Sequence, residues 1–407
     1  PNLSQRINAD GTLSFENEDH SYDGSTDTRA VPGDPLAVLR ELAAQIVRAG
    51  VKRITGNVLV DATLFPDAGP ENGTGAFVSP IVVNDNLVDV MVSPGAGLGD
   101  PVTISALPQT PYVTFVNRAT TSAAGSEPTL DMNADVSNAD GTHTVTVSGT
   151  QPAGAPMLYA YRVPEPRLFA QMALRVALKD AGVTIEGTPI TASFVRGAFA
   201  GSYTQSHLIA SHLSPPLAQD AYVTLKVSDN LHADLMPYVW ATYTKTATAD
   251  LLKSAFAQER RFLQGAGLNL DGASQQDGLG SSAFFTPDFM VHYLAWVRNQ
   301  SWYPQLLHGL PILGVDGTLF NIENNSPAKG RVFAKTGTWG SDNLLDDDGL
   351  VTKGLAGYTT TRQGHHIAFA FYINRMPGKH SAYAAKDAAH AAGEILGAMA
   401  TAAYELL

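Results

Sequence analysis

Lys335-Thr336-Gly337 is the tripeptide in this chain best suited to hold an anionic group. It closes the apolar run 331–334, which predicts a strand with the Lys335 and Thr336 side chains on opposite faces. A lysine ammonium beside a hydroxyl suits recognition of a carboxylate. Gly337 allows a ligand or a neighbouring backbone to approach closely. The alternative is an ordinary strand end with a solvated lysine.

Ser228-Asp229-Asn230 offers a hydroxyl and an amide between two predicted helices. On a rigid loop facing a cleft, the hydroxyl would relay protons and the amide would hold a substrate carbonyl. The alternative is an N-cap for a helix starting at Leu231, because Ser, Asp and Asn all cap helices well. A second copy, at 341–343, lies in a polar segment typical of a surface loop, so the tripeptide alone is a weak signal.

S-D-N and K-T-G are two parts of a three-part motif set whose third part, S-x-x-K, carries a nucleophilic serine. Ser326-Pro327-Ala328-Lys329 fits that pattern formally. The motif needs one helical turn, which places the lysine amine over the serine hydroxyl. The asparagines before it, the proline inside it and Gly330 after it predict a turn instead, so we reject Ser326 as the nucleophile.

The elements that must position these motifs follow a helix-then-sheet order. Helices are predicted over about 217–227, from Leu231, over 249–264 and over 287–298 after the cap Thr286. Strands follow at 331–336, 355–358 and 367–371, the last two joined by a turn at Gly364, and an alanine-rich helix covers about 383–405. This order predicts an α+β catalytic domain over 205–407.

Residues 1–204 predict an accessory region with a nested all-β unit. Its outer part covers about 1–64 and 161–204, with helices at 35–50, capped by Asp34, and at 166–181, and a strand at 54–61. Between about 65 and 160, short β-prone runs alternate with Gly, Pro, Asn and Ser. The runs are 87–92, 102–104, 112–116 and 142–147.

Composition narrows the classes of function. The 407 residues suggest two or three domains. A net charge of −12 argues against nucleic acid or an anionic membrane as partner, and no apolar stretch is long enough for a transmembrane segment. The absence of cysteine excludes disulfides and thiolate zinc sites. No metal or nucleotide motif is present, so no cofactor and no metal are expected. A start at Pro, without a visible signal peptide, predicts a processed or truncated chain.

Taken together, these segments resemble the class C low-molecular-mass penicillin-binding proteins, the D-alanyl-D-alanine carboxypeptidases/endopeptidases. The likeness covers about 30–400. Leu279 stands where the family's Asp-Gly-Ser-Gly stretch has serine, and 341–348 is an insertion where members usually turn back quickly. The matching segments are 33–35, 50–61, 223–234, 277–280, 310–319, 334–338 and 355–358. The implied fold is a β-lactamase/transpeptidase-like catalytic domain with an inserted β-rich accessory region.

The resemblance implies a role for each motif residue. Ser228 would relay the proton, Asn230 would orient the substrate and the nucleophile's lysine, and Lys335 would supply positive potential; these three are the catalytic candidates. Thr336 would bind the terminal carboxylate, and the Thr338 backbone N–H would form half of the oxyanion hole. Gly337 and Asp229 complete the expected substrate-binding set.

The implied activity is that of a penicillin-sensitive serine DD-peptidase, a hydrolase that cleaves D-Ala-containing peptidoglycan peptides through an acyl-enzyme. Stem peptides and beta-lactams are the implied partners, and a homo-oligomer stays open. The implied location is extracytoplasmic, in a bacterial periplasm or cell wall. The family carries its S-x-x-K helix upstream of the accessory region, so truncation or omission is expected here. The alternatives are an inactive relative that binds peptidoglycan peptides, and an esterase or D-aminopeptidase on the same fold.

Overall fold

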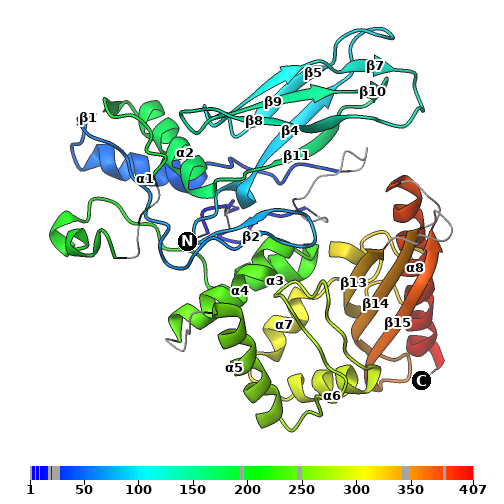
Figure 1. The fold of residues 1–407 in the computed structure, drawn as a ribbon. Helices are drawn as coiled ribbons and strands as arrows, with labels where there is room; N and C mark the ends of the chain where they lie inside the picture. Colours follow the sequence, from blue (N-terminus) through cyan, green and yellow to red (C-terminus); the bar gives the residue numbers. More distant parts are fainter. Residues whose placement is uncertain are drawn as a thin grey trace. The chain divides into compact units, whose positions relative to one another are not determined.

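The computed structural model contains two compact units, one formed by the first 215 residues and one by Pro216–Leu407 (Figure 1). It describes the whole chain except residues 1, 5, 9, 17–19, 21–27, 193, 195–196, 245–249, 342–348, 379–381 and 407. The contacts divide after Pro215, and the domain assignment with its boundary at 204/205 stays a prediction. Within the described residues, no helix is long and apolar enough to cross a membrane.

The first unit packs two helices with short strands around one core. Helices α1 (Ala37–Arg48) and α2 (Pro166–Asp180) pack on each other, and β1 (Arg53–Ile54) pairs with β12 (Thr184–Ile185). One sheet has the order β11-β4-β5 and another β6-β9-β8, while β7 pairs with β10 and β2 with β3. The other bounds are β2 Gly69–Pro70, β3 Phe77–Val78, β4 Leu87–Ser93, β5 Thr103–Leu107, β6 Val113–Asn117, β7 Thr120–Ser122, β8 Asp131–Ser137, β9 His143–Ser148, β10 Thr150–Pro152 and β11 Met157–Arg162, with 3₁₀ turns η1 Asn84–Asn86, η2 Ala200–Ser202 and η3 Gln205–His207.

Two predictions for this unit are wrong. The strand expected over 54–61 is only Arg53–Ile54, because its partner β12 supplies two residues and the chain bends at Thr55-Gly56. The helix expected after Asp34 begins at Ala37, and its N-cap is Leu36. The Asp34 carboxylate instead accepts the Leu36 N–H at 2.9 Å, so it closes the turn before the helix.

The second unit is α+β, as predicted, with helices preceding an antiparallel sheet (Figure 1). The sheet has the order β13-β14-β15. Helix α8 packs on one face through a core that includes Leu355 and Leu396, and α6 and α7 pack on the other through Leu294, Leu310 and Tyr358. The bounds are α3 Leu217–Val227, α4 Asn230–Tyr243, α5 Leu251–Gly265, α6 Pro287–Val297, α7 Tyr303–Gly309, η4 Gly317–Leu319, β13 Val332–Ser341, β14 Gly349–Thr360, β15 His366–Gly378 and α8 Ala382–Leu406.

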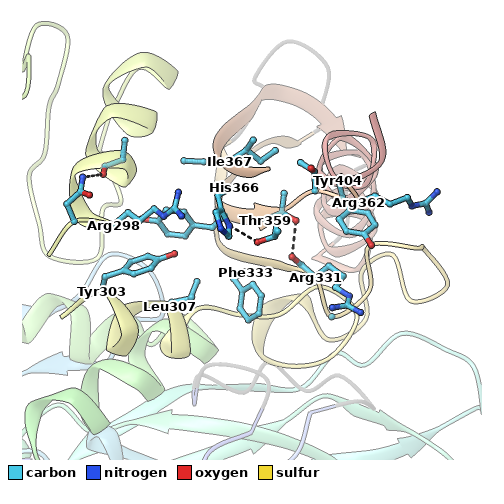
Figure 2. A pocket seen from close by; sticks show the side chains of 17 residues that line it. Arg298, Tyr303, Leu307, Arg331, Phe333, Thr359, Arg362, His366, Ile367 and Tyr404 are labelled. Carbon is cyan, nitrogen blue, oxygen red and sulfur yellow. Dashed lines mark hydrogen bonds between the residues drawn. The ribbon is translucent and has the colours of Figure 1, made fainter. Parts of the chain in front are cut away.

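Local signals explain several boundaries in this unit. The predicted cap Thr286 is confirmed, since its hydroxyl accepts the Phe289 N–H at 3.0 Å. The predicted Gly364 turn joins β14 to β15, with Gly364 at φ 90°. At that end of the sheet, the Thr359 hydroxyl donates to the Arg331 carbonyl at 2.9 Å (Figure 2). At Gly357, a Cβ would lie 2.1 Å from the Phe333 carbonyl oxygen, so β14 needs glycine beside β13.

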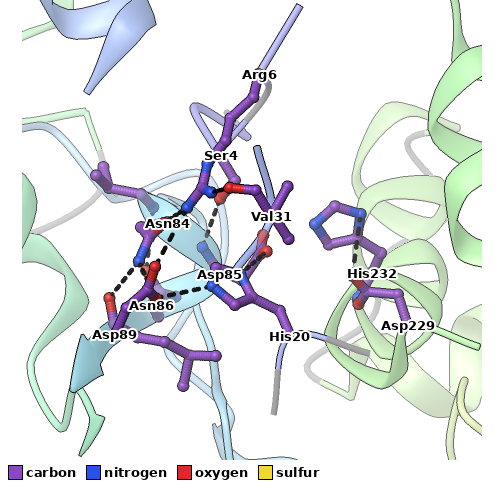
Figure 3. Close-up of polar contacts among 12 residues, drawn as sticks. Ser4, Arg6, His20, Val31, Asn84, Asp85, Asn86, Asp89, Asp229 and His232 are labelled. Carbon is purple, nitrogen blue, oxygen red and sulfur yellow. Dashed lines mark hydrogen bonds and ion pairs between the residues drawn. The ribbon is translucent and has the colours of Figure 1, made fainter. Parts of the chain in front are cut away.

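A buried polar network ties the N-terminal segment to the start of β4 in the first unit (Figure 3). His20 lies between two carboxylates, with Nδ1 2.6 Å from Asp85 and Nε2 2.9 Å from Asp89. Arg6 bonds the Asn84 side chain, and its guanidinium is 3.6 Å from Asp89. The backbone of 84–86 is left-handed throughout, with φ between 49° and 54°, which is costly for non-glycine residues. The network therefore holds a strained turn in place.

The charge state of His20 makes the stability of this unit pH-dependent. Burial disfavours the imidazolium, but Asp89 and Asp85 outweigh burial and raise the pKa of His20 to about 10. Because this value exceeds the unfolded value of about 6.5, the stabilisation is complete below about pH 6.5 and is lost as pH rises toward 10. The loss amounts to at most about 1.4 kcal/mol per pH unit.

We expect His20→Gln to destabilise the first unit most at pH 6 and progressively less up to pH 9.5. The measurement is hydrogen-exchange protection of β4 in wild type and variant compared at each pH, which cancels the intrinsic pH dependence of exchange. His292→Gln, at an exposed histidine of α6, serves as the control and should leave β4 unchanged. A stability difference that is constant over this pH range would contradict the role given to His20.

Candidate active site

Ser228 lies at the junction of α3 and α4. It is the C-cap of α3, and its backbone is left-handed, with φ 63° and ψ 45°. A non-glycine residue in this conformation costs on the order of 1–3 kcal/mol, and such residues persist only where the surroundings enforce them. The N–H groups of Ser228 and Asp229 both donate to the Thr224 carbonyl. The strained turn places Ser228 between the two helices, so its side chain is not part of the surface of either helix.

Asp229 is the residue that caps α4. Its carboxylate accepts the His232 N–H at 2.8 Å, and the helix begins at Asn230, one residue before the predicted start. The tripeptide can therefore cap a helix and also supply a reactive hydroxyl, because two different residues have these two roles. Asp229 satisfies the helix end, while Ser228 stays outside both helices.

Lys335 connects the two motifs across 107 residues of sequence. Its Nζ donates to the Ser228 hydroxyl oxygen at 2.7 Å and to the Thr336 carbonyl at 2.7 Å. Lys335 pairs with Ala356 of β14, and Phe333, two residues earlier on β13, pairs with Tyr358. Phe333, Ala356 and Tyr358 belong to the cluster on the sheet face that α6 and α7 cover, and Lys335 shares that face. The structure thus brings together Ser228 and Lys335, which sequence analysis could only propose as partners.

Thr336 faces the other way along β13 and bonds a residue that sequence analysis missed. Its hydroxyl oxygen is 2.7 Å from that of Thr318, in η4. Gly317 precedes Thr318 at φ 58°, and a Cβ there would lie 2.4 Å from the Lys226 carbonyl oxygen. Glycine thus lets η4 press against the end of α3, and this contact sets where Thr318 meets Thr336.

Lys226 and Asp316 form the ion pair behind this contact. The Lys226 side chain is 1% exposed, and its Nζ is 2.7 Å from both Asp316 carboxylate oxygens and 2.6 Å from the Leu310 carbonyl oxygen. Asp316 also accepts the Ile312 N–H at 2.8 Å. Burial lowers the pKa of Lys226, and the bonds to Asp316 oppose that shift. The Asp316 side chain is 29% exposed, so only the lysine of the pair is fully buried. Removing Asp316 would leave the buried Lys226 ammonium without its counter-charge, which is destabilising.

The loop 277–280 packs against α4 through its backbone. The Gly278 N–H donates to Asp234 at 2.8 Å, and the Asp277 carboxylate accepts the Gly280 and Ser281 N–H groups. A Cβ on Gly278 would lie 2.3 Å from the Ala233 carbonyl oxygen. Glycine at 278 is therefore required by packing, and the loop supports the helix that follows Ser228.

Gly337 and Thr338 continue β13 beyond Lys335. A Cβ on Gly337 would meet no heavy atom within 4 Å, so intramolecular packing does not require glycine there. The Thr338 hydroxyl accepts a hydrogen bond from Lys353 Nζ at 2.8 Å, across the strand pair. Burial lowers the pKa of Lys353 to about 8. Lys353 thus fixes Thr338 on the face opposite to Lys335.

Ser326 and Lys329 lie in a turn, as predicted. The Lys329 N–H donates to the Ser326 carbonyl at 3.1 Å, and the Ser326 hydroxyl interacts with the Thr401 hydroxyl at 3.2 Å. No helical turn stacks Lys329 over Ser326. The second Ser-Asp-Asn copy and the 341–348 insertion lie, beyond Ser341 itself, outside the described residues.

Sequence analysis missed Lys226, Asp316, Thr318 and Lys353. Asp316 and Thr318 lie in the segment 310–319, whose likeness to the family gave neither of them a role. Lys226 carries a usable signal, because it is a charged residue on a predicted helix beside apolar neighbours, and a buried charge needs an opposite charge. Nothing in the sequence identified which of the 38 acidic residues it would be.

The chain is similar to several known carboxypeptidases. A D-alanyl-D-alanine carboxypeptidase of Actinomadura sp. (strain R39) is 29% identical, over 82% of this chain and 64% of its own length. DacB, a D-alanyl-D-alanine carboxypeptidase of Haemophilus influenzae, is 24% identical, over 84% and 70%. A penicillin-sensitive carboxypeptidase A of Dictyostelium discoideum is 24% identical, over 75% and 57%. The chain thus spans slightly less than two thirds of the Actinomadura relative.

The fold is also that of a solved structure. The crystal structure of penicillin binding protein 4 (dacB) from Haemophilus influenzae aligns with a TM-score of 0.65 at 21% identity, over 89% of this chain and 78% of that one. The same protein complexed with a novel beta-lactam aligns with a TM-score of 0.65 over 97% and 84%. The sequence profile of one family matches residues 2–397. The chain belongs to the D-Ala-D-Ala carboxypeptidase 3 (S13) family.

Proposed function

We propose that this protein is a serine DD-peptidase, a carboxypeptidase/endopeptidase that hydrolyses D-Ala-containing peptidoglycan stem peptides and is acylated by beta-lactams. The hydrogen bond from Lys335 Nζ to the Ser228 hydroxyl, at 2.7 Å, is the observation that carries the proposal. This bond places the Lys335 ammonium and the Ser228 hydroxyl together beside β13, which is exposed from Gly337 onward. The named relatives and the family add support from outside the structure.

Ser228 acts as the proton relay. Because Lys335 donates to a lone pair of the Ser228 oxygen, the hydroxyl proton of Ser228 is directed elsewhere and is available for donation. The adjacent positive charge favours that donation. In an acyl-enzyme reaction the proton passes to the leaving amine of the terminal D-Ala, while the serine of the S-x-x-K motif attacks the preceding carbonyl carbon. General acid–base catalysis of this kind contributes about 10²–10⁴ in rate.

The strand after Lys335 binds the substrate. The Thr336 and Thr318 hydroxyl oxygens are 2.7 Å apart. With Thr318 as the donor of this bond, the Thr336 hydroxyl donates its own proton to the terminal carboxylate, and Lys335 supplies the positive charge. Thr318 is then a positioning residue. The Thr338 backbone N–H is one of two oxyanion donors, a type of contact worth about 10²–10³ in rate. Asn230 orients the peptide carbonyl, and Asp229 holds the helix that carries it.

Other parts of the proposal concern the whole protein. Residues 205–407 form the penicillin-binding, transpeptidase-like domain, and 1–204 form the accessory region with its nested β unit over 65–160. The protein acts outside the bacterial cytoplasm, in the periplasm or at the cell wall, where its substrate lies. A homo-oligomer is compatible with this role.

We expect Ser228→Ala to lower kcat/KM about 100-fold or more for release of D-Ala from an N-acylated Lys-D-Ala-D-Ala peptide. The protein is expressed from its complete gene, and formation of a benzylpenicillin adduct is followed by intact mass. Ser326→Ala is the matched control and should behave as wild type, because Ser326 lies in a turn. Peptide binding without turnover or adduct would favour an inactive relative. Turnover of simple esters but not of the peptide would favour the esterase.

Gly337→Ala tests whether substrate passes directly over β13. The new Cβ meets no protein atom, so we expect stability to change by less than about 1 kcal/mol while kcat/KM falls at least about tenfold. Gly340→Ala is the matched control on the same strand, because a Cβ there also meets no atom within 4 Å. Thermal unfolding and D-Ala release are measured on both variants. Equal activity of the two variants would refute the assignment of Gly337 to substrate binding.

A further inference from the structure

A pocket of about 940 Å³ lies at the end of the sheet where β14 passes into β15 (Figure 2). No residue of the candidate active site lines it. Its walls come from the ends of α6 and α8, from α7 and from the ends of the three strands. Its volume is at the upper end of the range for small-molecule sites, so it suits an oligomer better than a single small ion. The residues used below are Arg298, Arg331, Arg362, Tyr303, Phe333 and His366.

The pocket concentrates positive charge in an acidic protein. Three arginines and a histidine line it and no Asp or Glu does, although the chain carries a net charge of −12. Arg362 is ion-paired with Glu405 at 3.0 Å and lies over the Tyr404 ring. In the described part of the chain, the guanidinium groups of Arg298 and Arg331 have neither an ion pair nor a hydrogen bond. Two planar cations are thus available to a ligand.

Arg298 is the C-cap of α6 and lines the pocket. Burial raises the pKa values of Tyr303 and Tyr358, and the charge of Arg298 offsets part of that rise. In Figure 2, Arg298 and Arg331 lie on different sides of the pocket, and Tyr303 and Phe333 lie lower in the view. A ligand that engages both arginines therefore extends across the pocket.

The pocket lining combines aromatic rings with hydroxyl groups. Tyr303 packs edge-on against Tyr358 at 5.2 Å between ring centroids, and both Tyr303 and Phe333 are half-buried. The Thr360 hydroxyl is 2.9 Å from His366 Nδ1, and Thr360 is exposed. Half-exposed rings offer apolar faces to a ring-shaped ligand, and hydroxyls and imidazole offer partners to its polar groups.

A peptide is a poor fit at this end of β13. The Leu313 N–H donates to the Val332 carbonyl and the Ala334 N–H donates to the Pro311 carbonyl, both at 3.0 Å. These bonds cover the outer edge of the strand, so a peptide cannot add to the sheet there by backbone pairing. A ligand must be recognised by the side chains, which are cationic, aromatic and hydroxylated.

We propose that this pocket binds an acidic oligosaccharide, a short chain of sugar rings that carry carboxylate or phosphate groups. Arg298 and Arg331 pair with anionic groups on two different rings, since a guanidinium matches carboxylate and phosphate geometry in a bidentate manner. Tyr303 and Phe333 contact the ring faces. The site is independent of the proposed peptidase reaction, because no residue is shared.

Direct binding tests the proposal without any catalytic readout. Trigalacturonate, phosphorylated maltotriose and neutral maltotriose are titrated into the 407-residue chain by calorimetry. We expect at least one of the two anionic sugars to bind at least tenfold more tightly than maltotriose, with affinity falling as salt rises. The tighter of the two identifies the anionic group.

The variants are Arg298→Gln with Arg331→Gln, and Arg118→Gln as the matched control on an exposed arginine of the first unit. We expect the double variant to weaken binding about tenfold or more and the control to change it less than twofold, with unaltered thermal unfolding in both. Arg362→Gln should have the smaller effect, because Glu405 already pairs that charge. Equal binding of maltotriose, equal loss in the control, or tighter binding of tripolyphosphate or hexaglutamate would overturn the proposal.

Discussion

The ion pair between the buried Lys226 and the partly exposed Asp316 is the interaction on which the candidate site depends. It joins the last turn of α3 to the loop before η4, 90 residues further along the chain. A lysine with a 1% exposed side chain is tolerated because its three donor positions meet a carboxylate and a carbonyl. Since one partner without the other would leave an uncompensated buried charge, the pair fixes the relative position of the two segments.

The contacts of the candidate site extend from this ion pair along α3 in one direction and along η4 in the other. On one side, α3 ends two residues later at Ser228, whose left-handed backbone turns the chain into α4. On the other side, Gly317 lies against the Lys226 carbonyl, and the next residue bonds Thr336 on β13. The hydrogen bond between Lys335 and Ser228 then connects β13 directly to the end of α3. Side chains held from both ends in this way need little reorganisation when a substrate arrives.

The second unit contains two places where cationic side chains line a site, in a chain whose net charge is −12. At the first, Lys335 is committed to Ser228 and to the Thr336 carbonyl, so its charge is oriented before any ligand is present. At the second, Arg298 and Arg331 line a wide pocket. A carboxylate-bearing ligand is attracted to either place against a net charge of −12, which concentrates binding where donors are available.

The sequence by itself determined the α+β class, the motif residues and, apart from helix α7, the order of the helices and strands in the second unit. Hydrophobic periodicity, the Thr286 cap and the Gly364 turn are local signals, which depend on residues close together in the sequence and can therefore be recognised from it. The strand predicted at 54–61 fails for the opposite reason, because strand formation depends on a partner that the sequence does not reveal.

Only the tertiary structure decided which of these residues meet. The bond between Ser228 and Lys335 spans 107 residues, and the carboxylate chosen by Lys226 is one of 38. Asp229, not Ser228, is the helix cap, because the left-handed turn at Ser228 moves the start of α4 to Asn230. Gly278 and Gly337 look alike in sequence, yet a Cβ at the first would strike the backbone of α4 and a Cβ at the second would meet open space. The sequence specifies the chemistry of each side chain. Its contacts and its exposure depend on how segments distant in the sequence pack together, which only the tertiary structure shows.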